Sequence, residues 1–245
     1  MNSLKLSVLL LLVTFGSLMS EGRVSGNFVT EGQYYQQDSS IGTTEFPKEM
    51  AVQGYLNVRY NIDNFEFGMR YEAYRPPLLG IDARFENSGF PFLFGTYRSD
   101  LVDVTAGNFY EQFGSGLILR TYEEKALGVD NSLNGVRINL RPDDGIELTG
   151  LMGTMREFWS QSNSIIRGAK TKIYLDQYTD LFGDNGVSIE GGVVSKYEED
   201  QENFYNLPEN VFAYYLRSSF IGDNISLDAE YSYKINDPMS LNNFS

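Results

Sequence analysis

The sequence predicts an all-β protein, an antiparallel up-and-down transmembrane β-barrel, and three observations lead to this fold class. Apolar and polar residues alternate with a period of two over stretches of about ten residues, which is typical of half-buried strands. Strands of about that length can cross a bilayer when tilted. Short turns and long polar connections follow one another along the chain, and an apolar leader stands at its start.

The leader has the features of an export signal. Lys5 provides a positive start, residues 6–15 form a mostly apolar run, and the small residues Gly16, Ser17 and Ser20 follow. Such a run is too short to span a membrane as a helix and is typical of a secretory signal peptide. We therefore expect a signal peptide at 1–21 and an outer-membrane β-barrel of about eleven strands at 22–245.

The clearest strand pair lies at 51–74. The first arm carries Val52, Leu56 and Val58 on one face, and polar residues take the positions between them. Asp63-Asn64 separates the two arms, and this pair can adopt the positive φ that a tight hairpin needs. The other strands are expected at 22–37, 89–98, 101–109, 134–141, 146–155, 168–179, 187–197, 211–221 and 225–235.

The predicted connections alternate strictly between short and long. The short ones are 63–64, 99–100, 142–145, 180–186 and 222–224, and the long ones are 37–49, 75–88, 110–133, 156–167 and 198–210. Outer-membrane barrels have tight periplasmic turns and long extracellular loops, so this order favours a barrel. A β-sandwich with Greek-key crossings has no reason to sort its loops in this way.

The strand count predicts an incomplete barrel. Single-chain bacterial barrels have an even number of strands, whereas about eleven are expected here, and the tail at 236–245 is not strand-like. An open sheet in lipid would leave two unpaired edges, each unpaired backbone group costing several kcal/mol. We therefore expect an N-terminal fragment of a larger barrel.

The composition excludes several kinds of chemistry. The chain contains no Cys and no His, so it has no thiolate nucleophile, no Ser-His-Asp triad and no His metal site. Its formal net charge of −14 disfavours nucleic acid as a partner. An acidic run at 198–202 offers oxygen ligands for calcium, but such a run is more often a solvated loop. We expect no catalytic, metal or cofactor site.

Charged residues alternate with the apolar rows and are expected to line the lumen. This set comprises Arg59, Arg70, Glu66, Glu72, Asp103, Arg137, Glu190, Asp228 and Glu230. One interpretation is a selectivity lining for a solute. The other is a set of interior ion pairs that hold a narrow barrel closed.

The segment 106–138 reads AGNFYEQFGSGLILRTYEEKALGVDNSLNGVRI. It resembles an uncharacterised family of outer-membrane β-barrel proteins in Bacteroidota, a domain of unknown function. The resemblance implies location and architecture, and it supplies no catalytic residues. Gly107, Gly114, Gly116 and Gly128 would let this long loop fold tightly and turn back into the lumen.

Together these features predict a non-enzymatic integral outer-membrane protein. It would pass solutes in a porin-like way or act as a scaffold for surface assemblies, with outer-membrane lipid and other envelope proteins as partners. The alternative is a secreted or periplasmic β-sandwich that binds glycans through loop aromatics.

Overall fold

The computed structural model describes residues 22–36, 40, 49–199 and 208–237. The predicted signal peptide at 1–21 lies outside these residues. Parts of the connections at 37–49 and 198–210 and most of the tail at 236–245 also lie outside them. Among the described residues, no helix is long and apolar enough to cross a membrane.

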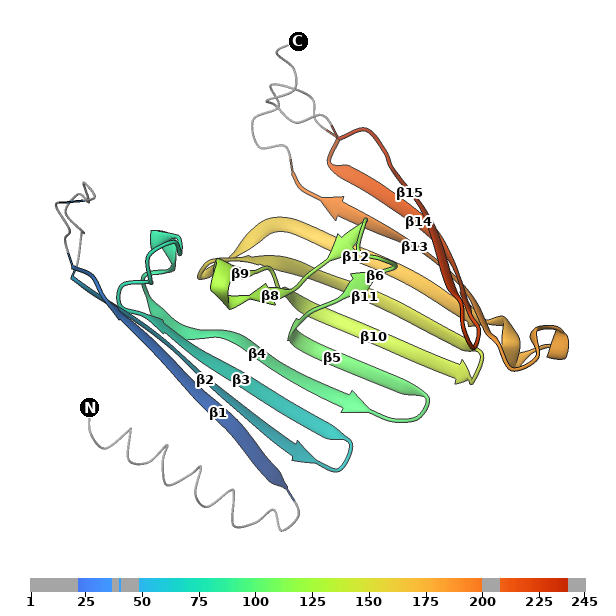
Figure 1. The fold of residues 1–245 in the computed structure, drawn as a ribbon, viewed down its shortest axis with the longest axis horizontal. Helices are drawn as coiled ribbons and strands as arrows, with labels where there is room; N and C mark the ends of the chain where they lie inside the picture. Colours follow the sequence, from blue (N-terminus) through green and yellow to red (C-terminus); the bar gives the residue numbers. More distant parts are fainter. Residues whose placement is uncertain (1–21, 37–39, 41–48, 200–207, 238–245) are drawn as a thin grey trace.

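One antiparallel sheet of eleven strands makes up most of the described chain (Figure 1). Strands that are neighbours in the sheet follow one another along the chain, so the predicted all-β, antiparallel and up-and-down arrangement is confirmed. The β-sandwich alternative is wrong for this part of the chain, because its long strands form a single sheet. The strands are β1 (Arg23–Tyr34), β2 (Met50–Ile62), β3 (Phe65–Tyr74), β4 (Ser88–Arg98), β5 (Val102–Phe109), β10 (Leu133–Asp143), β11 (Ile146–Glu157), β12 (Ser160–Tyr174), β13 (Gly186–Tyr197), β14 (Asn210–Ile221) and β15 (Ser226–Lys234).

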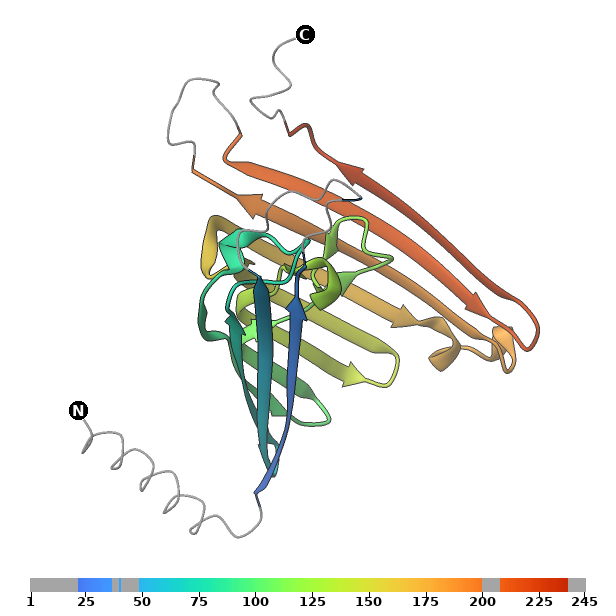
Figure 2. The same cartoon turned by 60° about the vertical axis from the view of Figure 1, so that its left-hand side comes forward.

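The sheet is curved and does not close. In Figure 1, β1 and β15 lie at opposite edges, and each of them pairs with one neighbour only, β2 and β14 respectively. Figure 2 shows β1 and β2 coming forward from the rest of the sheet, so that the strands form an open trough. Closure into a complete barrel therefore remains a prediction.

The hairpin at 51–74 forms as expected. Ile62 and Phe65 are its last paired residues, and Asp63 between them has a φ of 45°. Asp and Asn tolerate this left-handed conformation better than other residues with a side chain, which explains why a two-residue connection suffices here.

The predicted long connection at 156–167 is wrong. β11 continues to Glu157 and β12 already begins at Ser160, so Phe158-Trp159 alone joins them, with a φ of 56° at Phe158. The polar run after Trp159 has low β propensity, yet it forms the start of β12: Ser160 and Gln161 pair with β11, and residues 162–164 lie at a register shift. The indole N–H of Trp159 donates to the carbonyl of Phe85 at 2.8 Å and holds the turn in place.

The turn predicted at 180–186 is longer than expected. β12 ends at Tyr174, and the connection to β13 contains two 3₁₀ turns, η4 (Leu175–Gln177) and η5 (Asp180–Phe182). The backbone N–H of Val187 donates to the Asp176 carboxylate at 2.9 Å and ties this connection to β13. The alternation of short and long connections is therefore not strict.

The two faces of the sheet differ in polarity. The strand register places large apolar residues on the outer face, where they are exposed; Ile138, in the middle of β10, is 40% exposed. The same face carries Phe28, Leu56, Phe67, Met69, Leu93, Val136, Met152, Ile189, Leu216 and Leu227, all exposed. The inner face is mostly polar and charged, which is the reverse of a water-soluble sheet packed on a core.

A long loop at 110–132, hereafter the inner loop, lies over the polar face of the trough (Figure 1). It contains short elements: β6 (Gln112–Phe113), β7 (Leu119–Arg120), β8 (Glu123–Glu124), the 3₁₀ turn η3 (Lys125–Leu127) and β9 (Val129–Asp130). A further 3₁₀ turn, η2 (Ala83–Phe85), lies between β3 and β4.

The glycines predicted to shape the inner loop have the expected conformation. Gly107, Gly114, Gly116 and Gly128 all have positive φ. At Gly107, an added Cβ would collide with the carbonyl oxygen of Leu93, so both the φ of 101° and the close approach require glycine. The loop folds back over the polar face, and its position in a lumen stays a prediction because the sheet is open.

Candidate functional site

All nine residues predicted to line a lumen lie on the inner face, the side that the inner loop covers. The strand register places them there: Arg59, Glu66, Arg70, Glu72, Asp103, Arg137, Glu190, Asp228 and Glu230. Most of them form ion pairs or hydrogen bonds across this face. A lumen itself requires a closed barrel, so their lining role stays a prediction.

A group of five charged residues joins the inner loop to the sheet, and we call it the charge cluster. It consists of Arg70 and Glu72 of β3, Arg156 of β11, Glu123 of β8 and Asp130 of β9. Arg70 pairs with Glu72 at 2.6 Å and with Glu123 at 2.8 Å, and it also pairs with Asp130. Arg156 pairs with Glu72 at 2.8 Å and with Asp130 at 2.6 Å.

Four of the five side chains in the charge cluster are removed from water, and that of Glu123 is 24% exposed. Arg70, Glu72 and Arg156 are buried, with Glu72 only 1% exposed. Buried charges are tolerated only when they are paired and hydrogen-bonded, and here each carboxylate faces at least one guanidinium. Arg156 also donates to the carbonyl oxygen of Phe158 at 2.7 Å. The cluster therefore links the β11–β12 turn, β3 and the inner loop.

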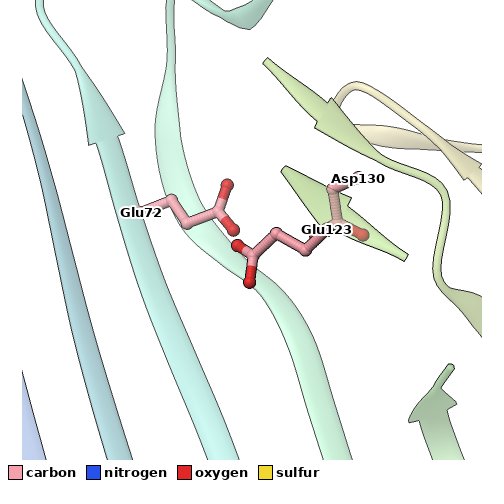
Figure 3. Close-up of side chains that lie close together, drawn as sticks. All are labelled: Glu72, Glu123 and Asp130. Atoms are coloured by element: carbon pink, nitrogen blue, oxygen red, sulfur yellow. The ribbon is translucent and has the colours of Figure 1, made fainter. Parts of the chain in front are cut away.

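Three carboxylates of the charge cluster come close enough to resemble a cation site. One oxygen each from Glu72, Glu123 and Asp130 lies within 4.8 Å of the others. Figure 3 shows Glu72 and Glu123 pointing their carboxyl groups toward each other. Arg70 and Arg156 already pair with these acids, so guanidinium groups supply the neutralising charge. We assign the group to loop attachment and not to a metal.

Burial affects the pKa of Glu123, one of the two acids that the inner loop contributes to the charge cluster. Desolvation raises the pKa of the Glu123 carboxyl, although Arg70 and Lys125 oppose this by favouring the charged form. A carboxyl held in this way is closer to neutrality than an exposed glutamate.

The tip of the inner loop makes a second contact with the sheet. Phe113 is fully buried and packs in a cluster with Leu151, Val194 and Tyr215. Gly168 lies beneath the ring, and a Cβ there would lie 3.0 Å from it. The absence of a side chain at this strand position therefore makes room for the aromatic ring.

Backbone amides beside Phe113 bind acids of the inner face. The N–H of Gly114 donates to Glu190 at 3.1 Å, and the N–H of Ser115 donates to Glu230 at 2.6 Å. The Tyr215 hydroxyl also donates to Glu190. Two of the predicted lining residues thus hold the loop.

The start of the inner loop is held by cations. Glu111 accepts from Arg137 at 3.2 Å and from Lys170 at 2.9 Å. Thr121 donates its backbone N–H to the Glu111 carbonyl at 2.9 Å. The two ends of the segment 112–120 therefore lie next to each other.

A cavity of about 500 Å³ lies beside the inner loop on the inner face, and we call it the basic pocket. Its charged lining consists of Arg59, Glu66, Arg70, Arg98, Glu123, Lys125 and Arg137. Aromatic rings of Phe92, Phe94 and Tyr110 form an apolar part of its wall. The pocket is wide enough for a small solute beside the loop.

Sequence reasoning missed several residues of this region. Arg98 and Arg156 lie at strand ends, where alternation is weakest, and Arg156 follows a register shift in β11. The loop acids Glu123 and Asp130 carry no periodic signal, because loop conformation brings them to the sheet. The glycines of this segment, in contrast, did predict that it folds back.

The chain belongs to a family of unknown function (DUF6029), whose model matches residues 1–245. Among curated proteins, none matches the chain. Among solved structures, the chain is similar to OccK3 (OpdO) of Pseudomonas aeruginosa, with 12% identity, a TM-score of 0.44, and coverage of 94% of this chain and 70% of that one. It is also similar to a BenF-like porin from Pseudomonas fluorescens Pf-5, with 10% identity, a TM-score of 0.42, and coverage of 87% and 67%. Both identities are too low to transfer a function.

Proposed function

We propose that this member of the DUF6029 family forms the wall of a non-enzymatic, porin-like β-barrel in the outer membrane, which lets small solutes pass. The observation that carries this proposal is the polarity of the sheet, apolar outside and charged inside. Export by a signal peptide at 1–21, a barrel domain at 22–245 and a Bacteroidota origin, which the resemblance of 106–138 implies, belong to the same proposal.

The outer face supports a lipid environment. Soluble proteins rarely expose a contiguous apolar surface that extends over several neighbouring strands. Membrane barrels alternate lipid-facing apolar residues with inward polar ones, which is the pattern of β10 and its neighbours. At 13 residues β2 is long enough to cross a bilayer with tilt.

The inner face supports a restricted passage. The inner loop fills part of the trough and is held by the charge cluster at one place and by Phe113 at another. These contacts favour the interpretation that interior ion pairs narrow the barrel, while the basic pocket leaves open space beside the loop. In lipid, the edges of β1 and β15 must be paired, since unpaired backbone groups there cost several kcal/mol each.

The experiment is conductance of the purified protein in a planar lipid bilayer. Because Glu111 and Thr121 are joined by a backbone hydrogen bond, residues 112–120 can be replaced by Gly-Gly without stretching the chain. We expect discrete channels, and we expect the shortened loop to raise single-channel conductance by about twofold or more, since pore area limits ion flow.

The matched control replaces 180–183 by Gly-Gly in the connection between β12 and β13, at the other end of the strands, and should leave conductance unchanged. Membrane insertion without conductance in both proteins would contradict solute passage and favour the scaffold alternative. A protein that stays soluble and monomeric without detergent would contradict the membrane location.

A further inference from the structure

The basic pocket concentrates positive charge in an acidic chain. Although the formal net charge is −14, the pocket lining contains five cationic and two acidic side chains: Arg59, Arg70, Arg98, Lys125 and Arg137 against Glu66 and Glu123. The charge of Arg70 is neutralised by the acids of the charge cluster, and that of Arg137 by Glu111. The remaining cations decide the charge that a solute would meet.

Two arginines of the pocket share a single carboxylate. Arg59 lies 3.7 Å from Glu66, and Arg98 pairs with the other oxygen of the same group. The side chains of Arg59 and Arg98 are 64% and 54% exposed, whereas that of Glu66 is 10% exposed. Both guanidinium groups therefore keep N–H donors free for a further partner, since each has five and Glu66 offers two oxygens.

A third cation approaches from the inner loop. Lys125 lies 3.7 Å from Glu123, but that acid is bound more closely by Arg70, at 2.8 Å. The ammonium group of Lys125 is thus incompletely neutralised. Cations from β2, β4 and η3 therefore line the same pocket. The alternation pattern of a single strand could not predict this arrangement.

The pocket also has an apolar wall. Phe92 stacks on Tyr110 with ring centroids 5.4 Å apart and meets Phe94 edge-on at 5.9 Å. Phe94 covers Gly68 of β3, where a Cβ would collide with its ring, so the ring lies close against the sheet. A ligand placed here would meet rings on one side and cations on another.

We propose that the basic pocket binds small organic anions, solutes that combine one carboxylate or phosphate group with an apolar part. This inference deepens the proposed function by naming the solute class, and it rests on that function only for the claim that the solute goes on to pass. Arg59 and Arg98 bind the anionic group through charge-assisted hydrogen bonds, and the rings cover the apolar part.

The test is isothermal titration calorimetry on the full chain in detergent. The probes are 3-phenylpropionate, phenyl phosphate and the neutral analogue 3-phenylpropanol. We expect both anions to bind and the neutral analogue to bind at least about tenfold more weakly, since loss of charge-assisted bonds costs at least one factor of ten. Binding of one anion only would narrow the class to carboxylates or to phosphates and still support the pocket.

Substitution separates the pocket from general charge effects. Arg59→Gln with Arg98→Gln should weaken anion binding by about tenfold or more. The control Arg84→Gln removes an equally exposed arginine, which pairs with Asp82 outside the pocket, and should leave binding unchanged. If the double variant fails to fold, the single variants Arg59→Gln and Arg98→Gln decide, because each leaves the other arginine paired with Glu66 and should still weaken anion binding.

Failure of this inference can be distinguished from failure of the proposed function. Channels that conduct while neither anion binds, or while the neutral analogue binds equally well, would overturn the anion pocket alone. Anion binding that depends on Arg59 and Arg98 in a protein without conductance would support the pocket and contradict solute passage.

Discussion

At the scale of single residues, the charge cluster determines how the inner loop is attached. Arg156 connects Glu72 of the sheet with Asp130 of the loop, and all three side chains are shielded from water. Such an arrangement is costly to break, because removing one partner leaves the other charge buried.

We predict that Arg156→Gln lowers the free energy of unfolding by about 3–5 kcal/mol, the usual cost of breaking a buried ion pair. Urea unfolding in detergent, followed by the fluorescence of the single tryptophan, Trp159, measures this change. Arg84→Gln is the control: it removes an exposed pair with Asp82 and a contact over the Phe158 ring, and it should cost no more than about 1 kcal/mol. Equal stability of both variants would show that the cluster does not hold the fold.

Glu123 gives the loop a pH dependence. Burial raises the pKa of its carboxyl above the ordinary value of 4.5, so the folded state binds this proton more tightly than the unfolded state. The stability that this group contributes is therefore present at low pH and is lost as pH rises through the folded-state pKa.

The variant Glu123→Gln mimics the neutral form of this side chain. We predict that the difference in stability between the variant and the unmodified protein shifts in favour of the variant as the pH rises from about 4 to 7. Thermal unfolding of both proteins at several pH values across this range measures the difference. Glu124→Gln is the neighbouring control, because the Glu124 side chain is exposed. A relative loss of stability on raising the pH would contradict the assigned direction of the shift.

At the scale of elements, the inner loop is held to the sheet at its start, at its tip and through the charge cluster. Phe113 anchors its tip in an apolar cluster on the sheet, and the exposed Arg120 follows a few residues later. Loops open locally when few buried contacts hold them, so the aromatic anchor should control access to the loop.

We predict that Phe113→Ala exposes the inner loop to trypsin at Arg120, because truncating a buried phenylalanine costs about 3–5 kcal/mol. The rate of cleavage at that bond, measured by mass spectrometry under native conditions, should rise at least about tenfold. Phe90→Ala is the control, since Phe90 is exposed on β4 away from the loop tip. Unchanged cleavage would mean that the ion pairs and hydrogen bonds of the loop hold it without the aromatic anchor.

At the scale of the whole molecule, the two faces of the sheet meet different surroundings. Ile138 and Asn139 are neighbours in the middle of β10, a strand of 11 residues in the centre of the sheet. Ile138 points to the outer face, and Asn139 points to the inner face beside Asp103 and Thr149. They form a matched pair for testing which face lies in lipid.

We predict that Ile138→Arg destabilises the protein in lipid vesicles by about 2–4 kcal/mol, the cost of an arginine at the lipid-facing midplane. Asn139→Arg should have little effect, since its side chain meets water and the Asp103 carboxylate. Urea titration of the vesicle-embedded proteins measures both. Equal tolerance of the two substitutions would contradict a lipid-facing outer surface.

The strands and their faces could be predicted before the structure was known, because both depend on local signals. Period-two alternation located all eleven strands and placed the nine predicted inner residues on one side. The pair Asp63-Asn64 marked the two-residue turn between β2 and β3. The register of a strand follows from its apolar row, since a slip of one residue would expose that row on the wrong face.

The ends of the connections and the pairing of charges could not be predicted in this way, because both depend on contacts between distant segments. The polar run after Trp159 became strand because β11 offered it a partner, and Arg156 met Glu72 although 84 residues separate them in the chain. The basic pocket likewise combines β2, β4 and η3. Contacts between distant segments depend on how the sheet curves and how the inner loop folds onto it, and no local periodicity records either one.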